Sequence, residues 1–401
     1  MAKKRNPKPF RKRFCWRYAP VAGELPALLR LQRLKRRSVP SPQTVLIVNC
    51  SLIGDFILSL PAITEFISQH AAARIDLLVS PSVAALAQKL RGVHHVYAAR
   101  TVFRRDTELE DSETLAPCYD LVVVMRLSGP ARRLLSTTSY CALRTYLIPL
   151  LKHGFQMAIR PINELKQMTE FNFEIFGKHE RKEQFLRADD VFDFSGVPVP
   201  VTSPGRTVLI HTGSGKKLYT WPRDKWLALI ERLHRRGDIS FVFVGGTEEE
   251  QAEFDYLASM VSFPLHSIIR RCDVLELLML MRVSQLFVGI DSGPRHLAHL
   301  VDLPSVSLLG PGPKSFQPLN SNARIIDETQ CERCVTFYCP HAPNCVEKIE
   351  VETVARACLS VLSGSGEAGT TDPTYSPAER FGSGSRIPST ISPRTGKGYP
   401  V

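Results

Sequence analysis

The hydrophobic positions of the chain fall into short runs that alternate with amphipathic stretches. Strand-like runs occupy residues 44–50, 74–80, 94–99 and 120–126, and a second series occupies residues 207–213, 239–246, 284–291 and 305–310. Helical patterns lie at residues 55–70, 82–90, 224–237, 249–260 and 273–281. Short apolar strands that alternate with helices are typical of parallel sheets covered on both faces. Two such series predict an α/β protein with two Rossmann-like, doubly wound domains that face a central cleft.

The length of 401 residues also favours two domains over a single core. We expect an N-terminal domain over residues 43–203 and a C-terminal domain over residues 204–362, with the boundary near the proline-rich GVPVPVTSPG. Residues 1–42 form a basic, partly disordered leader in this prediction. Residues 363–401 are rich in Ser, Gly, Pro and Thr and predict a disordered tail.

The net charge of +12 belongs to the leader. Residues 1–42 hold thirteen basic residues and one acidic residue, Glu24, whereas the basic and acidic residues of the remaining chain cancel. A near-neutral body argues against nucleic acid as the partner. The leader lacks the apolar core of a secretory signal, and its second half could form a basic amphipathic helix on an anionic membrane surface. A disordered arm without such a role is the alternative. No apolar run reaches the length of a membrane span.

The first candidate chemistry is NCSLIGDFILSLPAI at residues 49–63, where a strand gives way to an apolar helix. Asp55 either caps that helix or places a carboxylate at the carboxyl edge of a parallel sheet, where open α/β sheets bind ligands. Gly54 precedes it in the same turn.

Two further strand ends carry loops suited to a ligand. HTGSGKK at residues 211–217 offers small residues at Thr212, Gly213 and Ser214, and positive charge at Lys216 and Lys217, for a phosphate. VGGTEEE at residues 244–250 ends in Glu250. Its carboxylates could meet ribose hydroxyls or simply cap the next helix.

The most specific pattern is VGIDSGPRHLAHL at residues 288–300. The strand should end at Asp291, and Gly293 and Pro294 should open a helix. Amides around Ser292, Gly293 and Arg295 would then point along the helix dipole toward an anion such as a diphosphate. His296 lies one turn further, as a ligand contact or as a buried structural histidine.

Three segments in this order resemble glycosyltransferase family 9, the family of the ADP-heptose:lipopolysaccharide heptosyltransferases. They are LIGDFILSLPAI, TWPRDKWLALI and DSGPRHLAHLVDLPSVSLLGPGP, and the resemblance spans about residues 43–360. It implies a GT-B fold, with the acceptor on the N-terminal domain and the nucleotide-sugar on the C-terminal domain. It also implies inverting transfer without a catalytic metal.

By this resemblance Asp55 matches the catalytic base, and residues 291–296 match the donor-phosphate loop. The family usually carries a Lys two residues before the Trp of WP, where this chain has Tyr219. Lys216 or Lys217 could replace that charge. An acidic acceptor would favour basic residues on the N-terminal side, and Arg126 and Arg132 are candidates within a larger set of arginines.

Cys331, Cys334, Cys339 and Cys345 form a cluster with the spacing C-x2-C-x4-C-x5-C. Without a secretion signal, a structural zinc is more plausible than disulfides. The alternative is thiols packed under a loop.

Together these features predict an enzyme on the cytoplasmic face of a bacterial membrane. It would move heptose or a related sugar from a nucleotide diphosphate, as in ADP-heptose, to a lipopolysaccharide core or a similar envelope glycan. A nucleotide-sugar epimerase and a catalytically inactive glycan-binding homologue are the alternatives. A dinucleotide-dependent dehydrogenase is disfavoured because no G-x-G-x-x-G follows the first strand.

Overall fold

The computed structural model describes the two sheets and most of their helices. The described residues are 39–99, 114–126, 135, 138–145, 168–177, 186–199, 205–213, 219–310, 322–328, 339 and 341–363. The leader and the tail lie outside them. None of the helices in these ranges combines the length and the apolar character that crossing a bilayer requires.

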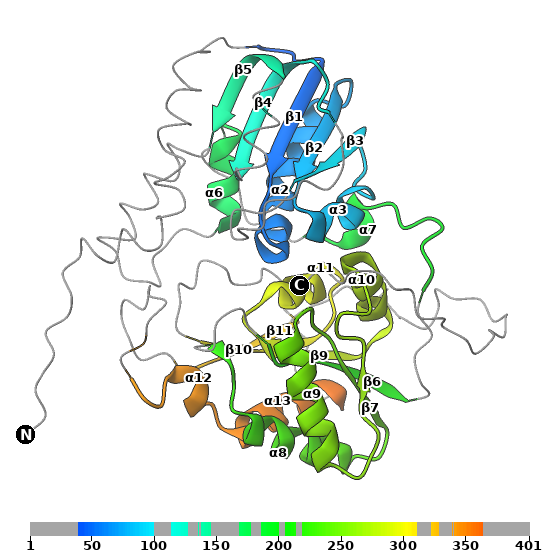
Figure 1. The fold of residues 1–401 in the computed structure, drawn as a ribbon, viewed down its shortest axis with the longest axis vertical. Coiled ribbons are helices and arrows are strands. Elements are labelled where there is room, and N and C mark those ends of the chain that lie inside the picture. Colours follow the sequence, from blue (N-terminus) through cyan, green and yellow to red (C-terminus); the bar gives the residue numbers. More distant parts are fainter. Residues whose placement is uncertain are drawn as a thin grey trace, which may run out of the picture.

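The N-terminal half is a five-stranded parallel sheet in the order β3-β2-β1-β4-β5 (Figure 1). Its strands are β1 (Thr44–Asn49), β2 (Arg74–Val79), β3 (His95–Ala98), β4 (Cys118–Arg126) and β5 (Ser139–Thr145). The helices among the described residues of this half are α2 (Ile53–Gln69), α3 (Pro81–Ala87), α6 (Met168–Ile175) and α7 (Ala188–Val191).

The C-terminal half is a six-stranded parallel sheet in the order β11-β10-β9-β6-β7-β8. Its strands are β6 (Arg206–His211), β7 (Ile239–Phe243), β8 (His266–Ser267), β9 (Leu286–Ile290), β10 (Ser305–Leu309) and β11 (Ala323–Asp327). Its helices are α8 (Arg223–His234), α9 (Glu248–Met260), α10 (Val274–Val283), α11 (Gly293–Leu300), α12 (Cys345–Lys348) and α13 (Val351–Leu362). The predicted doubly wound α/β class is confirmed.

Each sheet has one point where the strand order reverses. In the N-terminal sheet it lies between β1 and β4, and in the C-terminal sheet between β6 and β9. Open α/β sheets bind ligands at the carboxyl ends of the strands that flank such a point. The topology therefore points to the loops after β1 and β4 in one half, and to those after β6 and β9 in the other.

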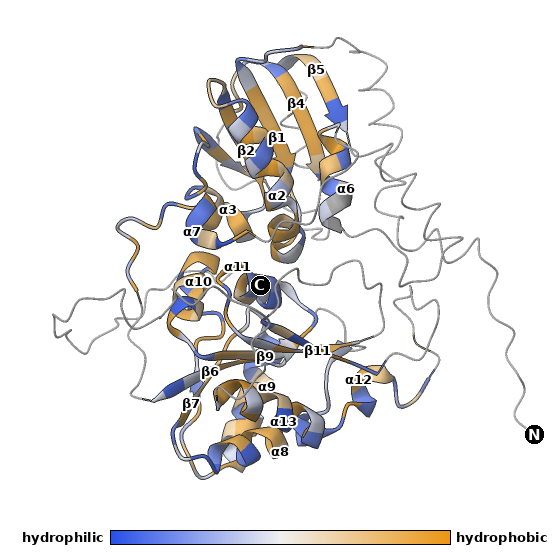
Figure 2. Cartoon of the chain, turned by 180° about the vertical axis from the view of Figure 1, so that it is seen from behind, coloured by the Kyte–Doolittle hydropathy of each residue, from blue (hydrophilic) through white to orange (hydrophobic). Residues whose placement is uncertain are grey.

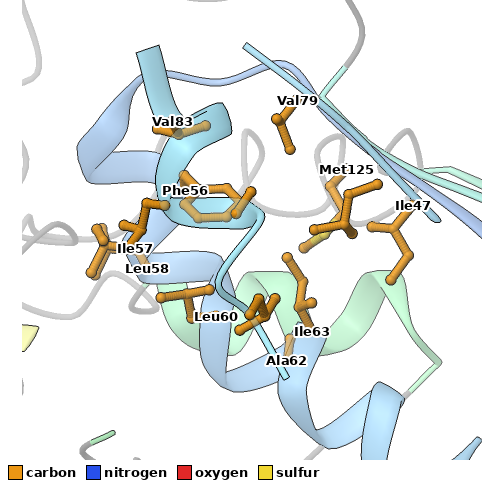
Figure 3. Close-up of a cluster of buried hydrophobic side chains, with 14 of the residues drawn as sticks. Ile47, Phe56, Ile57, Leu58, Leu60, Ala62, Ile63, Val79, Val83 and Met125 are labelled. Carbon is orange, nitrogen blue, oxygen red and sulfur yellow. The ribbon is translucent and has the colours of Figure 1, made fainter. Parts of the chain in front are cut away.

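Helix α2 anchors the N-terminal half because its apolar side chains fill the space over the sheet. Phe56, Leu60 and Ile63 are fully buried and pack with strand residues such as Ile47 (Figure 3). The hydropathy colouring shows the same division, with apolar strands inside and polar positions on outer helix faces (Figure 2). The cluster continues into α10 and α11, so one apolar core joins the two halves.

A second apolar cluster covers the other face of the C-terminal sheet. Residues of β6 alternate between the two clusters, because successive side chains of a strand point to opposite faces. Trp221 and Trp226 lie in this second cluster, with ring centroids 5.0 Å apart and nearly perpendicular rings. The Trp221 indole Nε1 donates to the Ile349 carbonyl at 3.0 Å, which ties the loop before α8 to the segment before α13.

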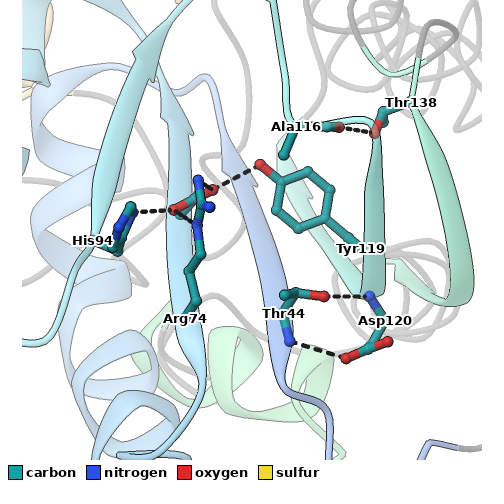
Figure 4. Close-up of polar contacts among 8 residues, drawn as sticks. Thr44, Arg74, His94, Ala116, Tyr119, Asp120 and Thr138 are labelled. Atoms are coloured by element: carbon teal, nitrogen blue, oxygen red, sulfur yellow. Dashed lines mark hydrogen bonds and ion pairs between the residues drawn. The ribbon is translucent and has the colours of Figure 1, made fainter.

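A polar network holds the opposite, amino-terminal end of the N-terminal sheet (Figure 4). The Asp76 side chain is fully buried, and its carboxylate accepts from the Tyr119 hydroxyl at 2.8 Å and pairs with Arg74 at 3.2 Å. Burial, followed by the bond to Asp76, raises the pKa of Tyr119. Asp120 accepts from the Thr44 amide at 3.0 Å and bridges β4 to β1. These contacts lie away from the strand ends where a ligand is expected.

The structure adds elements that the hydrophobic pattern did not predict. These are the strands β5, β8 and β11 and the helices α6, α7, α12 and α13. Helix α2 also begins two residues earlier than expected, at Ile53 rather than Asp55.

Candidate active site

The loop after β1 places Asp55 in the first turn of α2. Leu52 occupies the N-cap position with extended backbone, so Asp55 is the third residue of the helix. The interpretation of Asp55 as the helix cap is therefore wrong, because the cap position precedes it by three residues. Asp55 is half-buried. A carboxylate in a first turn is favoured by the helix dipole, and this one lies at the reversal point of the sheet.

The loop after β9 places a second helix start at the corresponding point of the other sheet. Ser292 occupies the N-cap position of α11 and Gly293 is its first residue. Asp291, Ser292 and Gly293 are half-buried, whereas His296 is only 5% exposed. Pro294 falls in the first turn, as expected, where its missing amide hydrogen costs nothing.

These two helix starts face each other and touch. An ideal Cβ on Gly54 would lie 2.7 Å from Cδ2 of His296, and one on Gly293 would lie 3.3 Å from Cβ of Ile53. Glycine at both positions suits this approach, because a Cβ at residue 54 would collide with the His296 ring and one at residue 293 would crowd Ile53. Asp55 and the residues 291–296 come from opposite halves of the chain, and the fold brings them together.

His211, at the end of β6, joins the α11 start to the rest of the sheet edge. Its Nδ1 lies 3.0 Å from the Ser292 hydroxyl, and its Nε2 lies 3.0 Å from Oε1 of Glu250. The Ser292 hydroxyl also lies 3.1 Å from the Ile290 carbonyl, to which it can donate. The imidazole thus connects β6, β9 and α9 across the reversal point of the sheet.

Glu250 has the structural role that sequence reasoning gave as its alternative. Its Oε2 accepts from the amides of Gly246 and Thr247 at 2.7 and 2.8 Å, and the Thr247 hydroxyl accepts from its amide. This is a complete capping box at the start of α9. Burial raises the pKa of Glu250, but the His211 contact and the two amides outweigh it and hold the pKa below its usual range.

The first residues of the Gly/Ser loop lie beside this carboxylate. Thr212 and Gly213 are buried, and a Cβ on Gly213 would overlap the Glu250 side chain. Glycine at 213 therefore makes room for the His211–Glu250 contact. Ser214, Lys216 and Lys217 lie outside the described residues, and a donor contact by any member of this loop stays a prediction.

Arg295 lies within α11, and its side chain is 1% exposed. Its Nη2 lies 2.6 Å from Oδ1 of Asp291 and 3.4 Å from Nε2 of His296. A guanidinium only donates, so Nε2 of His296 is the acceptor, and the proton of the neutral ring is on Nδ1. Burial, then Arg295 and His299, lowers the pKa of His296 well below its usual value. His296 is therefore neutral at pH 7.

The basic residues predicted on the acceptor side are only partly described. Arg126 ends β4, beside Asn49 of β1, and so lies at the same sheet edge as the Asp55 loop. Arg132 lies outside the described residues. Tyr219, at the position where the resembled family has Lys, approaches the backbone of Gly310 so closely that a Cβ there would lie 2.6 Å from its ring.

The cysteine cluster is described only at Cys339 and Cys345, both half-buried, since Cys331 and Cys334 lie outside the described ranges. Within those ranges no group of three or more His, Cys, Asp or Glu side chains is arranged to hold a metal ion. Zinc binding by the four cysteines stays a prediction.

A polar contact beside the site also links the two halves. Nη1 of Arg282, in α10, lies 2.7 Å from Oδ1 of Asp189, in α7, and its guanidinium lies 5.0 Å from the Phe194 ring centroid. The Asp189 carbonyl accepts from Arg91 at 2.7 Å. Helices α10 and α3 also contact each other here. Rotation of the halves would have to change these contacts.

Sequence reasoning missed the side chains of His211 and Arg295. His211 could have been found as the last residue of a predicted strand, directly before the Gly/Ser loop. Arg295 could have been found by its spacing of four residues from Asp291, at which a helical ion pair forms.

Comparison with known proteins gives a consistent assignment. The sequence model of "Glycosyltransferase family 9 (heptosyltransferase)" matches residues 150–343. Lipopolysaccharide heptosyltransferase 1 of Campylobacter coli is 23% identical over 189 residues, which are 46% of this chain and 53% of that protein. The match thus spans about half the length of that relative. Lipopolysaccharide heptosyltransferase 3 of Escherichia coli K12 is 23% identical over 286 residues, 64% of this chain and 79% of that protein.

Solved structures show the same fold. The Escherichia coli ADP-heptose lps heptosyltransferase II has a TM-score of 0.56 at 14% identity, covering 81% of this chain and all of that one. The Escherichia coli heptosyltransferase WaaC with ADP has a TM-score of 0.55 at 18% identity, covering 79% of this chain and 99% of that one. The expected GT-B architecture is confirmed by this likeness.

Proposed function

The chain belongs to glycosyltransferase family 9, and from this premise we propose that it is an inverting, metal-independent glycosyltransferase. Its donor would be a nucleotide diphosphate sugar such as ADP-heptose, and its acceptor a lipopolysaccharide core or similar envelope glycan. The observation that carries the proposal is the contact between the starts of α2 and α11, which brings Asp55 to the Asp291–His296 loop.

Each helix start has the chemistry that one side of the reaction needs. Asp55 would take the proton of the acceptor hydroxyl as the hydroxyl oxygen attacks C1 of the sugar. The bond between C1 and the phosphate oxygen would break on the opposite face, and the nucleoside diphosphate would leave with the electron pair. Amides at the start of α11, together with the helix dipole, would stabilise the charge that develops on it.

Separate placement of the two groups also fits a two-substrate reaction. Asp55 belongs to the N-terminal half and the phosphate loop to the C-terminal half, so donor and acceptor could bind to different halves. Approach of the halves would align the base with C1 and exclude water, which protects the donor from hydrolysis.

A direct assay tests this proposal. Purified protein is incubated with ADP-heptose and a heptose-deficient lipopolysaccharide core, and product is followed by mass spectrometry. We expect transfer only when both substrates are present, undiminished by EDTA. Conversion of the donor sugar without acceptor would indicate an epimerase. Donor and glycan binding without turnover would indicate an inactive homologue, an outcome that Tyr219 in place of the family's Lys makes worth measuring.

We also propose that the basic leader holds the enzyme at an anionic membrane on the cytoplasmic side, where such acceptors are assembled. Thirteen basic residues in residues 1–42 support this, since juxtamembrane basic residues each contribute about 1 kcal/mol of attraction to anionic lipid. Deletion of residues 1–36 should weaken binding to phosphatidylglycerol vesicles at low salt and leave turnover of a soluble acceptor intact. Unchanged vesicle binding would contradict this part of the proposal.

A further inference from the structure

A carboxylate at the mouth of an anion site poses an electrostatic problem. Asp291 is the residue immediately before the α11 cap, and its side chain is 30% exposed, so its charge faces any anion that reaches this helix start. Under the proposed function that anion is the diphosphate of the donor. Two like charges at close range in a partly desolvated site repel each other, which weakens binding of the anion.

The structure holds a buried cation against that carboxylate. Arg295 donates to Asp291 at 2.6 Å from the interior side, four residues further along α11. Among the described residues, the neighbouring His296 is neutral and Glu250 pairs with His211, so Arg295 is the cation in contact with the Asp291 carboxylate. At 1% exposure, Arg295 has almost no surface with which to contact a ligand, so an effect on the ligand passes through the residues that Arg295 contacts, Asp291 above all.

We infer that Arg295 is a positioning residue that cancels the charge of Asp291 and fixes its carboxylate, so that a nucleoside diphosphate can bind at the start of α11. This inference rests on the proposed function for the class of ligand. It assigns the buried guanidinium a role in donor affinity beyond its place in the fold.

The expected consequence is selective for the phosphates. Without Arg295, Asp291 would repel a diphosphate but would have little effect on an uncharged nucleoside bound further along the sheet edge. If Asp291 is neutral as well, nothing remains to be cancelled, and diphosphate binding should return. A role in packing alone would instead weaken both ligands together.

The experiment is a double-mutant cycle on the full chain, read by calorimetric titration. The proteins are the wild type, Arg295→Met, Asp291→Asn and the double variant. The probes are ADP, UDP, GDP and CDP, each with its nucleoside, and melting temperatures are recorded alongside. We expect Arg295→Met to weaken the preferred diphosphate about tenfold or more and its nucleoside less than about twofold, as for a lost charge-assisted contact. The double variant should recover to within about threefold of the wild type, and Asp291→Asn alone completes the cycle.

Several results would overturn the inference. They are unchanged diphosphate affinity in Arg295→Met, equal weakening of diphosphate and nucleoside, or a double variant as weak as Arg295→Met. If Arg295→Met does not fold, the double variant decides, because it buries no unpaired charge: retained diphosphate affinity supports the inference and its loss overturns it. Failure of the wild type to bind any of the four diphosphates would overturn the proposed function and this inference with it, whereas a binding wild type leaves the cycle to judge Arg295 alone.

Discussion

Helices α9 and α11 start at the same edge of the C-terminal sheet and are completed in opposite ways. At α9, Thr247 and Glu250 form a capping box, and Glu250 also accepts from the Gly246 amide. At α11, Ser292 occupies the same cap position, but its hydroxyl is turned to His211 and the Ile290 carbonyl. A start that its own side chains complete leaves fewer amides for a ligand, whereas one whose cap residue faces elsewhere keeps them for an anion. The same kind of turn thus serves structure in one place and binding in the other.

The start of α2 resembles that of α11 in this respect, since its N-cap residue, Leu52, makes no side-chain cap hydrogen bond. If this start also serves the reaction and not only the fold, Asp55→Asn should have the largest effect of the changes considered. Asn keeps the shape of the side chain but cannot take a proton, so kcat should fall about 10²–10⁴-fold. Melting temperature and nucleoside diphosphate affinity should stay near wild type, because Asp55 is not the cap.

Leu52→Ala is the matched control for this change, because Leu52 is 48% exposed and begins the same turn. If Asp55→Asn turns over within about threefold of the control, Asp55 is not the catalytic base and serves only as a carboxylate in the first turn of α2.

Gly54→Ala should have the next largest effect, through the contact between the two starts. The added methyl group would meet the His296 ring, and overpacking of this kind costs about 1–3 kcal/mol. We expect kcat to fall about tenfold to a hundredfold while nucleoside diphosphate affinity is kept, since only the approach of the halves is hindered. In a His296→Ala background the same change should cost little, and equal costs in both backgrounds would contradict the contact.

Acid should weaken the fold through the two histidines of α11. Burial first, and then Arg295, lowers the pKa of His299 as well as that of His296, so both bind protons more weakly in the folded than in the unfolded chain. As the pH falls below about 6.5, the ordinary pKa of histidine, the unfolded chain takes up these protons first, and stability falls by up to about 1.4 kcal/mol per pH unit for each ring. Stability should therefore be full above pH 7 and fall as the pH drops below about 6.5.

Thermal melts between pH 5 and 7.5 measure this dependence, and His299→Gln should make it shallower. An identical slope in the variant would show that His299 does not titrate on unfolding.

The smallest effect separates α9 from α11 directly. Thr247→Ala removes the cap hydroxyl and should cost about 1 kcal/mol of stability with no change in nucleoside diphosphate affinity. Ser292→Ala should do the reverse, with a small loss of affinity and little loss of stability. Guanidinium chloride unfolding measures the free energy of unfolding of each variant, and calorimetric titration measures its affinity for the nucleoside diphosphate. Equal losses of stability and of affinity in the two variants would show that the two helix starts do not differ in function.

Much of this architecture could be predicted from the sequence, because buried parallel strands such as residues 44–49 and 286–290 are continuous apolar runs. The positions of Gly54, Asp55 and the residues from Asp291 to His296 followed from glycines and carboxylates at strand ends. Strand β5 escaped because it alternates apolar and polar residues at the sheet edge, and β8 because it has two residues.

Contacts between distant residues could not be predicted from local pattern. His211 and Ser292 are 81 positions apart and meet only because β6 and β9 are neighbours in the sheet. The role of Glu250, by contrast, follows from local spacing, because only Glu250 of the three glutamates lies three residues after the Thr247 cap.

The tryptophan pair gives the molecule a built-in optical reporter. Trp221 and Trp226 are the tryptophans of the C-terminal half and are almost fully buried, and the chain's third tryptophan, Trp16, lies in the leader. In a Trp16→Phe background, intrinsic emission therefore follows the surroundings of the C-terminal core alone, while circular dichroism follows both sheets. Coincident transitions by the two probes would mean that the apolar core shared by the halves makes them unfold as one cooperative unit. If the emission and dichroism transitions had different midpoints, the C-terminal half would instead unfold as a separate unit.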